Sequence, residues 1–237
     1  HSIGTLSQLS VAFENNATRV RIPAQSGTST DYTISNTFDG GYIAFRFQAW
    51  GKQSVSATDY TPSGWMPKGY PGTTTANVYP GAFIESVGTH EGDKNWQFVT
   101  TFAEDGKKKE VLSYSDGLNR GRQVVTQVSS DGTTVVGQSI YDHEGRPAIQ
   151  VLPTPVENKD DLTYVTNLNQ NSSSTQYGAE DFDGKAAEAM STSSGASRYY
   201  SDQNGFNQSH NDYIPDAGGY PFAQTIYTQD QTGRVLE

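Results

Sequence analysis

The chain has 237 residues, no cysteine and a formal net charge of −10, with 16 Lys and Arg against 26 Asp and Glu. The lack of cysteine excludes a disulfide framework, a thiolate metal site and a cysteine nucleophile. The negative charge opposes phosphate backbones and anionic membranes, and no apolar run has a membrane-spanning length, so we expect neither a nucleic-acid partner nor membrane insertion.

The composition favours an all-β protein. Hydrophobic residues make up only 33% of the chain, whereas it contains 24 glycines and 14 tyrosines. This is typical of strands and turns in sheets that bury one face. The length allows a substantial core in one large domain or two smaller ones. The sequence starts at His1 and stops at Glu237, just after a repeated motif, so we expect a piece of a longer protein.

Residues 1–93 predict a β-sandwich-like domain of short strands. Apolar and polar residues alternate along residues 42–50, which predicts one strand with an apolar face and a mixed face. Shorter β-prone runs occupy residues 9–13, 18–23 and 33–35.

Several aromatic residues stand among prolines and glycines at the end of this strand and in the loop region after it. They are Trp50, Tyr60, Trp65 and Tyr70. Exposed rings on loops can stack on sugars or on an apolar partner, so a glycan- or protein-binding module at the cell surface is one alternative function. Because Trp and Tyr are mostly buried in proteins, we favour a packing role in which these rings seal the ends of the sheets.

The middle of the chain predicts a succession of antiparallel hairpins. β-prone runs lie at residues 83–87, 96–102, 109–114, 123–128 and 133–141. Two turn signals separate them, one at residues 104–107 and one at Asp131-Gly132. Asp-Gly between β-branched runs is the strongest short-range signal of a hairpin.

A small motif recurs three times, and in each copy an Arg follows an Asp by four positions. Its members are Tyr114, Asp116 and Arg120, then Tyr141, Asp142, Gly145 and Arg146, and finally Tyr227, Asp230, Gly233 and Arg234. The Asp carboxylate can accept backbone N–H groups two residues on, the Gly can take positive φ, and the Arg can fold back onto the carboxylate. The spacing therefore predicts turns that are locked by Asp–Arg pairs, a structural role.

Residues 94–237 resemble the tyrosine-aspartate (YD) repeat of the RHS proteins, large secreted β-rich chains. The pattern Tyr141-Asp-x-x-Gly-Arg146 carries the resemblance. The segment YPFAQTIYTQDQTGRV is similar to sequences in the large secreted RHS-like proteins of the Bacteroidetes type. The resemblance implies a spiral β-sheet that forms the wall of a hollow shell, which encloses a toxin or presents an adhesive surface. It also implies a secreted or cell-surface protein whose partner is the remainder of its own polypeptide.

Residues 157–197 interrupt the strand pattern with a polar, irregular stretch. Only residues 162–165 read as a strand, and residues 184–190 predict one short helical turn. Such long segments without regular structure are commonly binding loops, plugs or partly disordered regions. We therefore expect this stretch to be the least protected part of the chain.

The sequence assigns no cofactor, no metal and no catalytic residue. Asp181 and Asp183 have part of the spacing of a calcium loop, but the other alternating ligands are missing, so we favour an acidic loop that caps the short helix. The histidines lack metal-ligand spacing; they are His1, His90, His143 and His210. No nucleophile-elbow motif is present. We expect that the protein is not an enzyme. The other alternative is a glycan-active enzyme whose catalytic carboxylates belong to no recognisable sequence motif.

Overall fold

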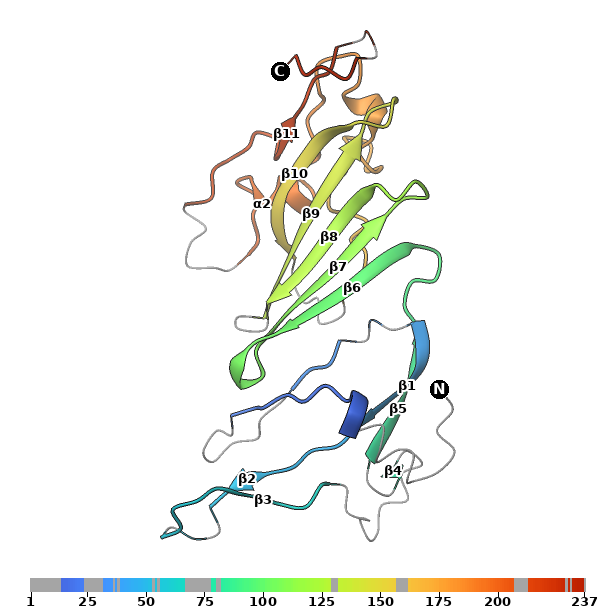
Figure 1. Ribbon diagram of the computed structural model, residues 1–237. Coiled ribbons are helices and arrows are strands. Elements are labelled where there is room, and N and C mark those ends of the chain that lie inside the picture. Colours follow the sequence, from blue (N-terminus) through green and yellow to red (C-terminus); the bar gives the residue numbers. More distant parts are fainter. Residues whose placement is uncertain are drawn as a thin grey trace. The chain divides into compact units, whose positions relative to one another are not determined.

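The computed structural model divides the chain into two compact units (Figure 1). Unit 1 comprises residues 1–20 and 38–90, and unit 2 comprises residues 21–37 and 91–237. The sequence instead predicted a single boundary between residues 93 and 94. The structure describes residues 14–23, 32–35, 37, 39–52, 54, 56–66, 78–79, 82–128, 132–156, 162–206, 213–228, 230 and 232–236.

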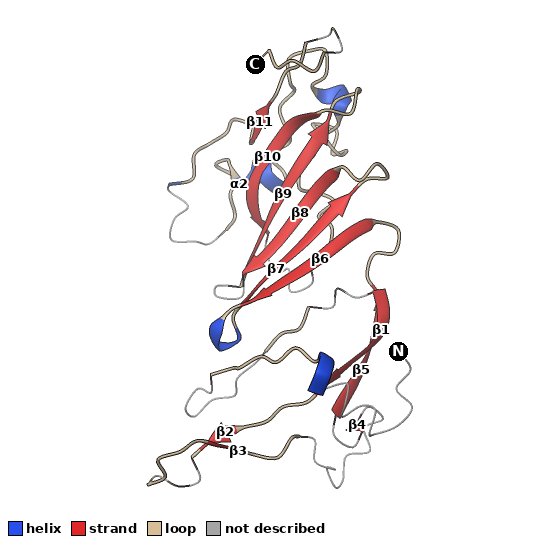
Figure 2. Ribbon diagram, viewed as in Figure 1, coloured by secondary structure: helices blue, strands red, loops and turns tan. Residues whose placement is uncertain are grey.

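The protein belongs to the all-β class, with 39% strand and 8% helix (Figure 2). The helical elements of unit 2 are short: η1 (Glu104–Gly106), η2 (Ala179–Asp181) and α2 (Gly195–Tyr199). The helical turn predicted at residues 184–190 is wrong. The backbone there bonds to other segments, since the Met190 N–H donates to the Gly219 carbonyl oxygen at 2.7 Å.

The described part of unit 1 contains a three-stranded antiparallel sheet and a two-stranded ribbon. The sheet has the order β1-β5-β4, and the ribbon pairs β2 with β3. The bounds are β1 (Asp39–Phe45), β2 (Trp50–Gly51), β3 (Thr61–Pro62), β4 (Val78–Tyr79) and β5 (Ala82–Thr89). The strand predicted at residues 42–50 ends at Phe45, which pairs with Phe83 near the start of β5.

Four other predictions for the N-terminal part have different outcomes. Residues 18–23 and 33–35 are not strands. The side chain of Ser35 instead donates a hydrogen bond to Glu110 of unit 2 at 2.9 Å. The strand predicted at residues 9–13 lies outside the described residues, and the β-sandwich stays a prediction.

Unit 2 is built on a six-stranded antiparallel sheet with the order β11-β10-β9-β8-β7-β6. Its strands are β6 (Asn95–Phe102), β7 (Lys108–Ser115), β8 (Gly121–Val128), β9 (Thr133–Tyr141), β10 (Pro147–Val156) and β11 (Phe222–Gln224). Strands β6 to β10 are neighbours in the sequence and in the sheet, so the predicted hairpins of this part are present.

One face of this sheet is buried beneath the segment after β10, which we call the cover segment (residues 162–200). In Figure 1 its orange coil lies behind the strands. Its buried hydrophobic residues are Leu162, Val165, Leu168, Tyr177, Phe182, Met190 and Ala196. They join strand residues such as Val136 and Ile149 in two core clusters. The segment has little regular structure, as expected, but its sparse apolar side chains reach the same sheet face despite their irregular spacing. The expectation that it is the least protected part of the chain stays a prediction.

Candidate functional site

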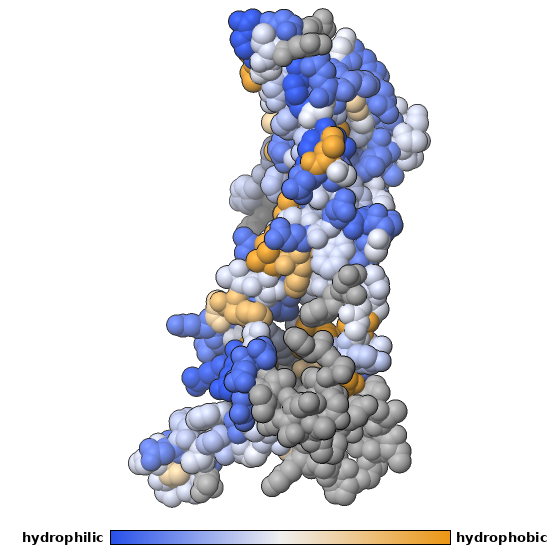
Figure 3. Space-filling model, turned by 45° about the vertical axis from the view of Figure 1, so that its right-hand side comes forward, coloured by the Kyte–Doolittle hydropathy of each residue, from blue (hydrophilic) through white to orange (hydrophobic). Residues whose placement is uncertain are grey.

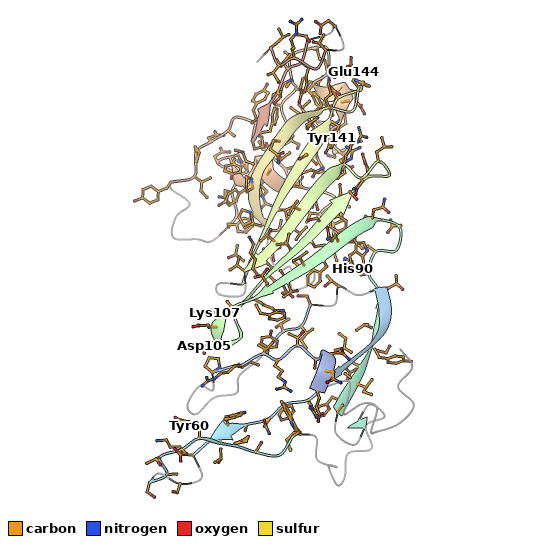
Figure 4. The ribbon with its side chains drawn as sticks, viewed as in Figure 1. Tyr60, His90, Asp105, Lys107, Tyr141 and Glu144 are labelled. Atoms are coloured by element: carbon orange, nitrogen blue, oxygen red, sulfur yellow. The ribbon has the colours of Figure 1, made fainter. Side chains whose placement is uncertain are left out.

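The three predicted Asp–Arg motifs each form a closed turn in unit 2. We call them turn 1 (residues 116–120, between β7 and β8), turn 2 (residues 142–146, between β9 and β10) and turn 3 (residues 230–234). Figure 4 labels Tyr141 and Glu144 at the end of the sheet where turn 2 lies. Figure 3 colours the surface near the C-terminus mostly hydrophilic, as expected for a surface of charged and polar turns.

Turn 2 has the most enclosed carboxylate. Asp142 accepts the Arg146 backbone N–H at 2.8 Å and the Arg146 Nε–H at 2.7 Å. The backbone closes as well, because the Gly145 N–H donates to the Asp142 carbonyl oxygen at 3.0 Å and Gly145 has a φ of 80°. The Asp142 side chain is only 3% exposed, so its bonds to the turn replace solvent almost completely.

Turn 1 repeats this geometry without a glycine at the same place. Asp116 accepts the N–H groups of Leu118 and Arg120, both at 3.0 Å, and the Arg120 Nε–H at 2.8 Å. Asn119 takes the positive φ of 60°, a conformation that Asn tolerates. The backbone and side-chain hydrogen bonds from Arg120 lower the pKa of Asp116 to about 2.

Turn 3 is the exposed member of the series. Asp230 lies 2.7 Å from the Arg234 Nη2 and accepts the Thr232 N–H at 3.2 Å. Hydrogen bonds from Thr228, Thr232 and Arg234 lower the pKa of Asp230 below its usual range. The Arg234 side chain is 71% exposed, against 29% for Arg120 and 21% for Arg146.

Turns 1 and 2 are linked by an arginine and a tyrosine. The Arg120 guanidinium lies 4.7 Å from the centre of the Tyr141 ring, and its Nη1 donates to the Gly145 carbonyl oxygen at 3.1 Å. The Tyr141 hydroxyl returns a hydrogen bond to the Gly121 carbonyl oxygen at 2.7 Å. We call such a link, an arginine of one turn with the tyrosine of the next, a rung.

A second rung joins turns 2 and 3 in the same way. Arg146 lies 4.6 Å from the centre of the Tyr227 ring and donates to the Thr228 carbonyl oxygen at 3.4 Å. The Tyr227 hydroxyl donates to the Pro147 carbonyl oxygen at 3.0 Å. Cation–π contact and hydrogen bonding thus hold each arginine between its own aspartate and the next tyrosine.

The first tyrosine of the motif has a different place. Tyr114 lies on the buried face, 2% exposed, where its hydroxyl donates to Glu91 and its ring meets Tyr164 edge-on. Burial raises the pKa of Tyr114 above its usual range. By strand register, Ser115 opposite Gly121 holds the position that Tyr141 opposite Pro147 holds in turn 2.

The sequence did not predict the rungs, because the motif groups each tyrosine with the turn that follows it. The only signal was the recurrence of an aromatic residue shortly before the second and third aspartates. Nothing in the local pattern indicates that its ring contacts the preceding arginine, which lies 21 positions earlier for Tyr141 and 81 positions earlier for Tyr227.

The aromatic residues proposed for ligand stacking lie in unit 1 and are exposed. Trp50 and Tyr60 are each 65% exposed, and Trp65 is 38% exposed. Figure 4 labels Tyr60 beside the β2–β3 ribbon. Arg46 lies 4.2 Å from the centre of the Trp65 ring. Trp50 and Tyr60 are thus largely exposed, whereas Trp65 packs against Arg46, and both the packing and the stacking role stay predictions. Tyr70 lies outside the described residues.

Asp181 and Asp183 serve internal contacts of unit 2. Asp181 accepts the Gly178 N–H at 2.7 Å, a capping contact at the start of η2. Asp183 accepts the backbone N–H of His143 at 3.0 Å and lies 2.8 Å from its Nδ1, and these bonds lower the pKa of Asp183. Within the described ranges, no group of three or more His, Cys, Asp and Glu residues could hold a metal ion.

A polar pocket of about 440 Å³ lies between strands β8–β9 and the cover segment. Its lining includes Arg122, Gln138, Tyr141, Tyr164, Gln176 and Glu180. Several of these groups already have partners within the protein, since Gln176 donates to the Tyr164 hydroxyl and Arg122 lies over Tyr141. Gln176, Tyr164, Arg122 and Tyr141 of the lining thus make contacts within the protein.

A family model matches less than half of the chain. Residues 90–194 match a family model described as a domain of unknown function (DUF6443). This range includes turns 1 and 2, strands β6 to β10 and most of the cover segment. No curated protein and no solved structure matches the chain. In the part of the chain that the structure describes, no helix is both long and apolar enough to span a membrane.

Proposed function

We propose that the chain is a structural section of a large exported RHS-type protein with YD repeats. In this proposal the sheet of unit 2 is a stretch of shell wall that serves toxin delivery or an adhesive surface. Its principal partner is the remainder of the same polypeptide, and its place is outside the cell or on the cell surface.

The observation that carries the proposal is the repetition of the rung. The Arg120–Tyr141 and Arg146–Tyr227 links share the ring stacking and the hydroxyl bond in return, and in both the guanidinium also donates to a backbone carbonyl, that of Gly145 or Thr228. A link that joins one turn to the next suits a wall that is built from successive hairpins.

The chemistry of the rungs also favours a structural role over catalysis. Each carboxylate and guanidinium of turns 1 and 2 is bonded within the turn or to the neighbouring turn. Groups held in this way resist displacement, because removing one partner would leave a partly or fully buried polar group without a hydrogen bond. They are suited to fixing the spacing between hairpins.

Electron microscopy of the polypeptide that contains this chain tests the proposal. We expect a hollow shell whose wall contains the six-stranded sheet with turns 1 to 3 in one row. A solid globular particle, or a shell in which this sheet lies outside the wall, would overturn it.

The exposure of Trp50 and Tyr60 favours a second candidate function, a glycan-binding surface on unit 1. Flat aromatic rings on a ribbon can stack on sugar rings at little cost in side-chain entropy. A glycan array with the intact chain should then give binding that Trp50→Ala and Tyr60→Ala abolish. Tyr42→Ala is the matched control, because Tyr42 is 78% exposed on β1 of the same unit. Equal binding by all variants would exclude this surface.

A further inference from the structure

Turn 3 presents half of a rung. It has the aspartate, the arginine and the positive φ of 70° at Gly233 that the other turns share. The guanidinium of Arg234 bonds to Asp230 and Thr232 of its own turn. No ring contact of Arg234 occurs within the described ranges, although Arg120 and Arg146 each face a tyrosine.

Among the described residues, the backbone after turn 3 also has an unpaired edge. The Arg234 carbonyl oxygen accepts the Thr228 N–H at 2.8 Å, and the Leu236 N–H donates to the Ile226 carbonyl oxygen at 2.7 Å. Because these bonds flank the bridge of Val235 with Tyr227, the N–H and carbonyl of Val235 point away from that partner. Val235 and Leu236 are 60% and 67% exposed.

Val235 occupies the position whose carbonyl is used in both existing rungs. Gly121 follows Arg120 and accepts the Tyr141 hydroxyl, and Pro147 follows Arg146 and accepts the Tyr227 hydroxyl. The strands after those arginines are likewise paired along their outer edges, β8 with β9 and β10 with β11. Turn 3 therefore offers the ring site, the hydroxyl acceptor and the strand edge together.

We propose that Arg234 and Val235 form a docking site for one further hairpin that carries a Tyr-Asp turn and belongs to the same polypeptide. Its tyrosine ring stacks on Arg234, its hydroxyl bonds to the Val235 carbonyl oxygen, and its strand pairs with residues 234–236. This docking site rests on the proposed function, because it names the segment that would continue the shell wall at residues 234–236.

A second copy of the chain does not fit the site. In a second copy, Tyr141 and Tyr227 already occupy the rungs of Arg120 and Arg146, and Ser115 stands at the ring position of turn 1. A serine side chain offers no aromatic face to a guanidinium. The occupant must carry an aromatic residue at this position, as Tyr141 and Tyr227 do in turns 2 and 3.

The test extends the intact chain with a duplicate of its own hairpin. Residues 133–156 are appended after residue 237 through a short Gly-Ser linker, and hydrogen exchange is measured at the Val235 amide. We expect exchange at least tenfold slower than in the unextended chain. Changing the duplicated Tyr141→Ala, or Arg234→Gln in the chain, should abolish the protection, whereas Arg198→Gln on α2 should leave it intact.

Two results would overturn the docking site. One is unchanged exchange at Val235 in the extended chain, and the other is equal protection by the tyrosine and alanine forms of the duplicate. A separate arm adds the same hairpin as a free peptide at equal concentration, and equal protection there would contradict the assignment to the same polypeptide. A shell seen by microscopy together with unchanged exchange would reject this site alone, because the proposed function would stand.

Discussion

The Tyr227 hydroxyl donates a hydrogen bond to the Pro147 carbonyl oxygen at 3.0 Å, although 80 residues separate the two positions. The same relationship holds between Tyr141 and Gly121 over 20 residues. The rung geometry is therefore independent of how much chain lies between two turns, which makes it a property of the turns themselves.

The hydroxyl and the ring of Tyr141 should contribute separately to the unfolding free energy. Tyr141→Phe keeps the ring under Arg120 and removes the bond to Gly121, so we expect a loss of about 0.5–1 kcal/mol in unfolding free energy. Tyr141→Ala should cost more because the cation–π contact is lost as well. Urea unfolding measures both, with Tyr42→Phe as a control that should change nothing. Equal losses for Phe and Ala would show that the ring contact contributes nothing.

The buried carboxylate of Asp142 should be sensitive to substitution. Asp142→Ala leaves the Arg146 backbone N–H without its acceptor, and we expect a loss of about 1–3 kcal/mol in unfolding free energy. Arg146→Lys should also destabilise, because an ammonium cannot reproduce the planar arrangement of the guanidinium. A double-mutant cycle on Asp142 and Arg146 measures their coupling. A coupling energy of zero would refute the turn-locking role.

Gln123 ties the cover segment to the sheet. Its side chain is buried, accepts the Val165 N–H at 2.7 Å and donates to the Val165 carbonyl oxygen at 3.0 Å. Gln123→Leu would leave both backbone groups unsatisfied, so we expect a loss of about 2–4 kcal/mol in unfolding free energy. Gln97→Leu on β6 is the matched control, since Gln97 is exposed and its replacement should stay within about 0.5 kcal/mol. If Gln123→Leu and Gln97→Leu lowered the unfolding free energy equally, the stabilising role of the Gln123–Val165 hydrogen bonds would be contradicted.

Gly195 holds a position that no side chain fits. Its φ is 58°, and an added Cβ would lie 1.9 Å from the Leu168 carbonyl oxygen. We expect Gly195→Ala to cost about 2–5 kcal/mol, the sum of left-handed strain and overpacking. Gly184→Ala shares the positive φ but meets no neighbour within 4 Å, so it should cost only about 1–2 kcal/mol. Thermal unfolding compares the two variants. Equal losses of stability would show that the Leu168 carbonyl oxygen does not restrict residue 195.

Acid should weaken turn 1 within a defined window. The pKa of Asp116 is lowered in the folded state to about 2, below its ordinary 3.8. A lowered folded-state pKa stabilises the protein fully above the unfolded-state value, and the stabilisation disappears as the pH falls through about 2. We expect the urea midpoint to fall between about pH 4 and 2, and to fall less in Asp116→Asn. An identical pH dependence in the variant would contradict the assignment.

The hairpins of unit 2 could be predicted because each is encoded locally. Alternation along residues 133–141 and the Asp–Arg spacing are visible within ten residues, and a strand period or a turn needs no more. The cover segment could not be predicted in this way. Its buried Leu162, Tyr177 and Met190 follow no helical or strand period, because isolated turns direct each of them to the sheet.

The helix prediction failed for a related reason. Residues 184–190 have the composition of a helical turn, yet their backbone groups bond outside the segment, and the helix forms at Gly195–Tyr199 instead. Tertiary hydrogen bonds overrode a weak local propensity. The rungs depend on contacts across 25 and 82 residues, which a single sequence does not encode in a readable form.

The long interval before the second rung matters while the chain is being synthesised. Arg146 can bond to Thr228 only after 82 further residues have been synthesised. At typical rates of translation this takes on the order of 10 s. During that time the outer edge of β10 is without β11, and an unpaired edge invites pairing with other chains. Pro147, Pro153 and Pro155 fall within β10 and lack N–H groups. The nascent strand thus offers fewer donors to a wrong partner at the stage when it is most vulnerable.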